Sequence, residues 1–70
     1  MKNPFENKRN SEIIELINEY IHSERDRAIM KRRLVDGIHF DPLAEEFDLS
    51  TLQVKRIVYK QSENVLNHIK

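Results

Sequence analysis

The chain has 70 residues, of which 34% are charged and 39% are hydrophobic, and its 12 basic residues balance its 12 acidic ones. This length allows one domain, and the charge balance excludes a histone-like polycation and an acidic disordered tail. The absence of cysteine excludes disulfides, thiolate metal sites and a cysteine nucleophile, and it fits a reducing cytosol. No apolar run approaches the ~20 residues that span a membrane, and the polar start of the chain does not resemble a signal peptide. We therefore expect a small cytoplasmic protein with no membrane partner.

The balanced total hides a segregation of charge along the chain. Residues 25–39 and residues 51–70 each carry a net charge of +3, whereas residues 1–24 carry −2 and residues 40–50 carry −4. Two basic segments that meet in space would form a basic face on a neutral protein. The alternative is that the acidic residues pair with the basic ones and neutralise them, and charge alone does not decide between the two.

The first predicted element is a helix that follows a flexible lead-in at residues 1–10. Asn10 or Ser11 can cap this helix. Apolar residues then recur at three- and four-residue steps over residues 11–22, with glutamates on the opposite side. Residues 11–70 are expected to form a single helical domain.

A second helix is predicted after Ser23, whose hydroxyl is a candidate cap with Asp26 three residues further on. Its apolar residues continue to Val35. Gly37, the only glycine of the chain, follows at the place where a left-handed residue ends a helix. The sequence therefore predicts a helix that stops just before Gly37.

The start of the third predicted helix is the clearest in the chain. The Asp-Pro pair at residues 41–42 combines a capping carboxylate with a proline that needs no donor in the first turn. This short helix is expected over residues 42–47, followed by a tight turn at residues 48–49. Ser50 then caps a fourth helix that reaches the C-terminus. No strand pattern competes, so the predicted fold class is all-α, a small four-helix domain.

The stretch at about residues 41–61 has the pattern of a helix-turn-helix, in which a short helix, a turn of three or four residues and a second helix pack together. A small residue is needed where the two helices cross, and Ala44 lies there. Asp48 stands at the turn position that requires a positive φ, which aspartate adopts more easily than most residues. The other packing positions are apolar, namely Leu43, Phe47, Leu49, Val54 and Ile57.

These residues resemble region 4 of bacterial sigma factors, and the resemblance covers the stretch from Ser23 to Lys70. In that family an Arg- and Leu-rich helix ends in a Gly-containing turn, then a Leu-Ala-Glu-Glu-Phe-like helix precedes a recognition helix with a Ser or Thr cap. Here residues 43–47 read Leu-Ala-Glu-Glu-Phe and residues 49–50 read Leu-Ser. The resemblance implies binding in the major groove of promoter DNA and frequent contact with RNA polymerase. The parts with which a complete sigma factor melts promoters have no counterpart, so the chain is most similar to a free-standing regulator of bacterial phages or mobile elements.

The residues of the fourth helix that face away from its apolar side are predicted to contact double-stranded DNA. The first turns of a recognition helix reach base edges, so we expect Gln53 to read adenine and Arg56 to read guanine. Further residues are suited to phosphates or to a thymine methyl group, namely Ser50, Thr51, Leu52, Lys55, Tyr59 and Lys60. Arg32 and Arg33 of the second helix are expected to extend this basic face along the DNA backbone.

The competing hypothesis is a protein-interaction module. The first helix carries six large apolar residues in nine positions, which is more than one face of a small bundle needs. An interaction surface is therefore predicted at Ile14, Ile17, Tyr20 and Ile21. It would either pair two chains into a homodimer or bind RNA polymerase or a sigma factor, and in the latter case the chain needs no DNA affinity of its own. Leu52 fits either hypothesis.

Catalysis is not expected. The three histidines, His22, His39 and His68, are far apart in the sequence and lack metal-ligand spacing. The glutamates of the first helix form a row that is typical of a solvated face, and no glycine-rich phosphate loop occurs. The sequence therefore predicts no catalytic residue, no cofactor and no metal.

Overall fold

The computed structural model describes Phe5 and residues 7–69, although not the side chain of Ile69, and within these residues it contains four helices and no strand. The helices are α1 (Asn10–Tyr20), α2 (Glu24–Leu34), α3 (Phe40–Glu46) and α4 (Thr51–Ile69). The predicted all-α, four-helix fold is therefore confirmed for this part of the chain. The rest of the expected lead-in, residues 1–4 and 6, and Lys70 lie outside the described residues.

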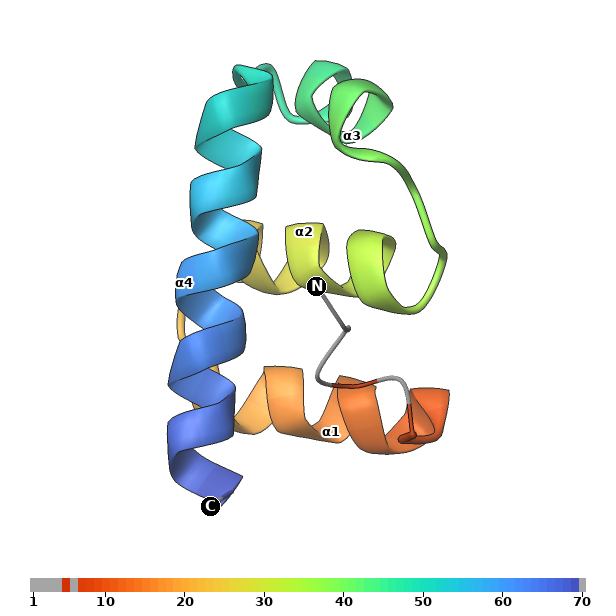
Figure 1. Ribbon diagram of the computed structural model, residues 1–70, viewed down its shortest axis with the longest axis vertical. Helices are drawn as coiled ribbons and strands as arrows, with labels where there is room; N and C mark the ends of the chain where they lie inside the picture. Colours follow the sequence, from red (N-terminus) through yellow and green to blue (C-terminus); the bar gives the residue numbers. More distant parts are fainter. Residues whose placement is uncertain (1–4, 6, 70) are drawn as a thin grey trace.

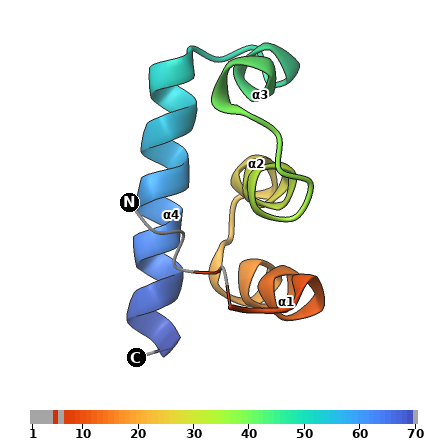
Figure 2. The ribbon, with the colours of Figure 1, turned by 45° about the vertical axis from the view of Figure 1, so that its right-hand side comes forward.

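The long helix α4 runs along nearly the whole length of the molecule. Its 19 residues correspond to about 28 Å of helix, close to the longest dimension of the molecule, 31 Å. The other three helices lie across one side of α4, with α1 near its C-terminal end, α2 near its middle and α3 near its N-terminal end (Figures 1 and 2). The other three helices thus leave the opposite side of α4 uncovered.

The hydrophobic core lies between α4 and the three helices that cross it. Each helix contributes fully buried side chains, which are Ile17 from α1, Ile29 and Met30 from α2, Leu43 from α3, and Val54 and Val65 from α4. These residues recur at three- and four-residue steps, so each helix buries one stripe. None of the described helices combines the length and the apolar character needed to cross a membrane.

The predicted cap and turn residues between the helices are confirmed at three positions. The backbone N–H of Asp26 donates to the Ser23 hydroxyl at 3.3 Å, so Ser23 caps α2. Gly37 has a φ of +73°, which frees the chain to leave α2 in a left-handed conformation. Asp48 has a φ of +56° in the turn between α3 and α4. Local side-chain chemistry therefore sets where α2 begins and how the chain turns after α2 and α3.

Two predicted helix starts are wrong. α1 begins at Asn10, with Arg9 rather than Asn10 or Ser11 at the capping position, and the Arg9 side chain makes no capping hydrogen bond. α3 begins at Phe40, with His39 at the capping position, so Asp41 lies inside the first turn. The Asp41 carboxylate instead accepts a hydrogen bond from a residue of α4, and this tertiary contact replaces the expected capping role.

The expected lead-in contains a core residue. Phe5 is only 1% exposed, and its carbonyl accepts a hydrogen bond from the backbone N–H of Lys8 at 3.0 Å. Phe5 belongs to the same buried cluster as the side chains of α1, α2 and α4. The expectation of a flexible segment over residues 1–10 is therefore wrong at Phe5, because burial of a phenyl ring stabilises the folded chain.

Candidate nucleic-acid interface

The junction of α3 and α4 fixes the start of α4. The backbone N–H of Leu49 donates to the carbonyl of Ala44 at 2.9 Å, which closes the turn after α3. Leu43 and Ala44 are buried against α4. The Thr51 hydroxyl donates to a carboxylate oxygen of Asp41 at 2.7 Å, which ties the first turn of α4 to the first turn of α3. The start of α4 is therefore held against α3 by packing and by a side-chain hydrogen bond.

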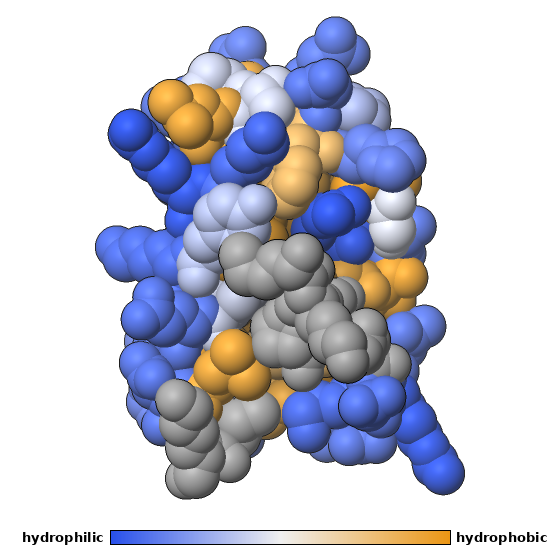
Figure 3. Space-filling model, viewed as in Figure 1, coloured by the Kyte–Doolittle hydropathy of each residue, from blue (hydrophilic) through white to orange (hydrophobic). Residues whose placement is uncertain are grey.

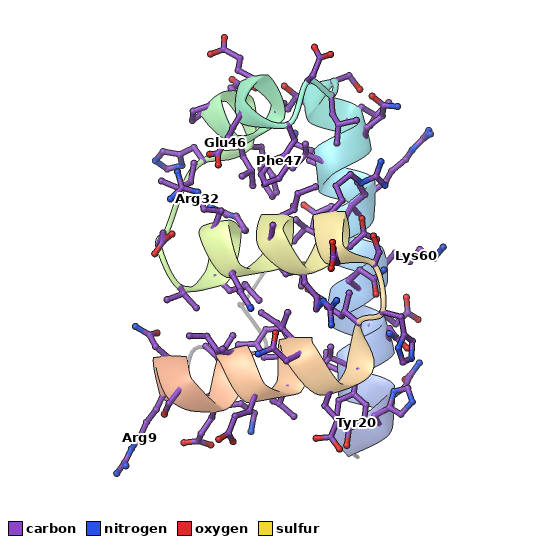
Figure 4. The ribbon with its side chains drawn as sticks, turned by 180° about the vertical axis from the view of Figure 1, so that it is seen from behind. Arg9, Tyr20, Arg32, Glu46, Phe47 and Lys60 are labelled. Atoms are coloured by element: carbon purple, nitrogen blue, oxygen red, sulfur yellow. The ribbon has the colours of Figure 1, made fainter. Side chains whose placement is uncertain are left out.

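The uncovered side of α4 carries most of the residues that the sequence predicted for DNA contact. Leu52 is 57% exposed and Tyr59 is 54% exposed, whereas Val54 and Val58 on the inner side are buried. Figure 3 shows a hydrophobic patch among hydrophilic side chains near the start of α4. Lys60 extends from α4 away from the other three helices (Figure 4). The outer side of α4 thus combines apolar and cationic groups within three turns.

Three exposed cations of α4, Lys55, Arg56 and Lys60, form what we call the basic stripe. Within the described residues none of the three takes part in an ion pair. Glu63 is also exposed one turn beyond Lys60, so the stripe is bounded toward the C-terminal half of the helix. The basic stripe therefore retains its positive charge for an external anion.

Arg32 has a different role from the one predicted. Its guanidinium donates to Glu46 at 2.9 and 3.2 Å and to Asp36 at 3.0 Å, which joins α2 to α3 (Figure 4). The bonds to Glu46 and to Asp36 raise the pKa of Arg32 above its usual value. Two carboxylates more than neutralise this cation, so the prediction that Arg32 extends the basic face is corrected.

Gln53 and Ser50 form a reciprocal cap at the start of α4. The backbone N–H of Gln53 donates to the Ser50 hydroxyl at 3.1 Å, and the backbone N–H of Ser50 donates to the Gln53 side-chain oxygen at 2.9 Å. The sequence predicted Ser50 as a cap but did not predict that Gln53 would complete it. Within the described residues the Gln53 amide nitrogen has no acceptor, so it remains available to a ligand.

Two of the four residues predicted to form an interaction surface on α1 are buried in the core. Ile17 and Ile21 are 0% and 1% exposed, so they cannot contact a partner, and this part of the prediction is corrected. Ile14 and Tyr20 are half-buried. The Tyr20 ring stacks on His68 with ring centroids 4.5 Å apart, which engages it within the molecule. α1 packs on both α2 and α4, and these two contacts account for its additional apolar residues.

Sequence reasoning missed Phe40. This half-buried residue begins α3, and the Arg33 guanidinium lies 4.4 Å from the centre of its ring. The Arg33 side chain also donates to the carbonyl of Ile38 at 3.2 Å and has no carboxylate partner among the described residues. Only its place one residue before the Asp-Pro pair could have marked Phe40, since an aromatic residue there lies near the start of a helix.

The described part of the chain holds no group of three side chains able to bind a metal ion. Comparisons with protein-family models, with curated proteins and with solved structures return no match to this chain. The function must therefore be argued from the chain's own geometry.

Proposed function

We propose that the protein is a sequence-specific DNA-binding regulator of transcription, in which α3, the turn at residues 47–50 and α4 act as a helix-turn-helix. The N-terminal turns of α4 would lie in the major groove of double-stranded DNA. The observation that carries this proposal is the basic stripe on the uncovered side of α4, at the end where α4 is held against α3. The resemblance to sigma factor region 4 supports the same function and suggests a bacterial phage or mobile-element origin.

The groove-facing residues divide by chemistry. Arg56 would donate two hydrogen bonds to a guanine, and the free amide nitrogen of Gln53 would donate to an adenine. Leu52 would contact a thymine methyl group, as would the methyl group of Thr51, whose hydroxyl is committed to Asp41. Lys60, at the end of the stripe, would contact a phosphate.

The acidic residues of the α3 region limit how the DNA can lie. Glu45 and Asp48 are exposed and have no cation partner among the described residues. These carboxylates would repel phosphates, so the DNA backbone must run past α4 on a path that avoids them. The phosphate contacts would therefore come from α4 and α2 rather than from the outer side of α3.

A second candidate function is a protein-interaction module without DNA affinity. Leu52 and Tyr59 are seven residues apart and are both more than half exposed, so they lie on the same side of α4. An RNA polymerase or sigma-factor surface would bury these two side chains. A homodimer through this side would occupy the basic stripe and compete with DNA.

The test is selection of bound duplexes from a random-sequence pool, followed by affinity measurements on the selected site. We expect Arg56→Ala to weaken binding by about 1–3 kcal/mol and to relax one base position. Arg9→Ala is the matched control, since Arg9 is exposed and immediately precedes α1, at the end of the molecule remote from α3 (Figure 4). Its affinity and motif should equal those of the wild type.

Two outcomes would contradict the proposal. One is an unchanged motif and affinity in Arg56→Ala. The other is no binding of any duplex at ~50 mM salt, where non-specific basic contacts are strong. A loss of polymerase or sigma-factor binding in Leu52→Ala and Tyr59→Ala would then favour the interaction module.

A further inference from the structure

Three helices bring side chains together around the ring of Phe40. The Arg33 guanidinium of α2 lies 4.4 Å from the ring centre, and the Lys55 ammonium of α4 lies 5.7 Å from it. The Tyr59 ring of α4 meets Phe40 edge-on, with centroids 6.4 Å apart and an interplanar angle of 64°. We call Arg33, Lys55 and Tyr59 around Phe40 the aromatic cluster.

The aromatic cluster holds two positive charges, and the part of the chain that the structure describes places no paired counter-charge on them. Both cations lie within the ~6 Å range of a cation–π contact with one ring. Neither Arg33 nor Lys55 forms an ion pair within the described residues. The carboxylate of Asp41, the residue that follows Phe40, accepts instead from the Thr51 hydroxyl at 2.7 Å. Two like charges beside one ring repel each other, and an anion that contacts both would relieve that repulsion.

The cluster also contains hydrogen-bond donors that have no acceptor among the described residues. Arg33 uses one N–H group for the carbonyl of Ile38, and the other N–H groups of its guanidinium have no acceptor in the described part of the chain. The Lys55 ammonium and the Tyr59 hydroxyl have no hydrogen-bond partner among the described residues. A phosphate presents several acceptor oxygens and suits such a set of donors.

The cluster adjoins the residues proposed to read bases. Lys55 precedes Arg56 on α4, and Tyr59 follows Arg56 by three residues. With Arg56 at a base edge, Lys55 and Tyr59 would lie toward the side of the groove that α3 borders. Phosphates line both sides of the major groove, and contacts to them fix the register of a recognition helix.

We propose that Arg33, Lys55 and Tyr59 together bind a single backbone phosphate of duplex DNA, with Phe40 as the positioning residue. The assignment rests on the proposed function and deepens it, because it makes α2 part of the DNA interface through Arg33 rather than Arg32. One phosphate held from α2 and α4 would set the angle at which α4 enters the groove.

Salt dependence of DNA affinity distinguishes one shared phosphate from two separate ones. Each neutralised phosphate contributes about 0.9 to the slope of log affinity against log salt. We expect the double variant Arg33→Gln/Lys55→Gln to reduce the magnitude of the slope by about 0.9, whereas two separate contacts would reduce it by about 1.8. The matched control Lys8→Gln/Arg9→Gln removes two cations beside α1 and should leave the slope unchanged.

A second variant tests the role of the ring. Phe40→Leu keeps both cations and the apolar bulk but removes the aromatic face, so we expect affinity to fall about two- to fivefold. A melting curve by circular dichroism checks that this variant remains folded. Unchanged affinity in folded Phe40→Leu would refute the positioning role.

The two proposals fail in different ways. No binding of any duplex by the wild type would overturn the proposed function and this assignment together. Binding by the wild type with a slope change of about 1.8, or of zero, in the double variant would overturn the shared phosphate alone.

Discussion

Replacement of Phe5 by alanine tests whether the N-terminal segment belongs to the core. Phe5 is 1% exposed and packs in the central cluster. Truncation of a buried phenylalanine to alanine costs about 3–5 kcal/mol. A 70-residue domain has a total stability of about 4–10 kcal/mol, so this single change should remove a large share of it. We expect the midpoint of thermal unfolding, followed by circular dichroism, to fall by more than about 10 °C.

Leu52→Ala is the control, because it removes an apolar side chain that is 57% exposed. It should change the free energy of unfolding by no more than about 0.5 kcal/mol. A Phe5→Ala protein as stable as Leu52→Ala would refute the reasoning, since a ring buried in the core cannot be lost without cost.

Two further changes test the connections between helices. Gly37→Ala should cost about 1 kcal/mol in denaturant unfolding, because a Cβ at φ +73° meets backbone strain but no neighbouring atom, and Gly37→Asn should cost less. Gln61→Leu should cost about 1–3 kcal/mol, because it removes the donor that lies 2.8 Å from the carboxylate of Asp26, a residue only 9% exposed. Lys60→Leu is the exposed control for the latter, and equal stability of these two variants would show that the bond to Asp26 contributes nothing.

Local patterns in the sequence predicted the helices well. Three- and four-residue spacing of apolar residues depends only on helix geometry, so it identified α1, α2 and α4, whereas the Asp-Pro pair identified α3. Ser23, Gly37 and Asp48 act through the backbone of their immediate neighbours, and their predicted roles are confirmed. Properties that depend on a few adjacent residues are thus accessible from one sequence.

Tertiary partners were not accessible in the same way. Asp41 has the pattern of a cap, but its carboxylate bonds to a hydroxyl ten residues away. Arg32 meets Glu46 fourteen residues further on, so its charge is neutralised although the segment around it is basic. Periodicity marked Ile17 and Ile21 as apolar without revealing whether the same chain or a partner covers them. The acidic residues therefore neutralise only part of the basic segments, since Arg32 is paired with carboxylates and the basic stripe is not.

The most direct test of the DNA-binding proposal is the salt dependence of duplex binding by the wild-type chain, measured by fluorescence anisotropy. With one phosphate at the aromatic cluster and others at Lys60 and along the start of α4, we expect log affinity to fall linearly with log salt with a slope of about −2 to −3. Affinity that does not change with salt, or no binding at ~50 mM salt, would contradict the proposal that the uncovered side of α4 binds DNA.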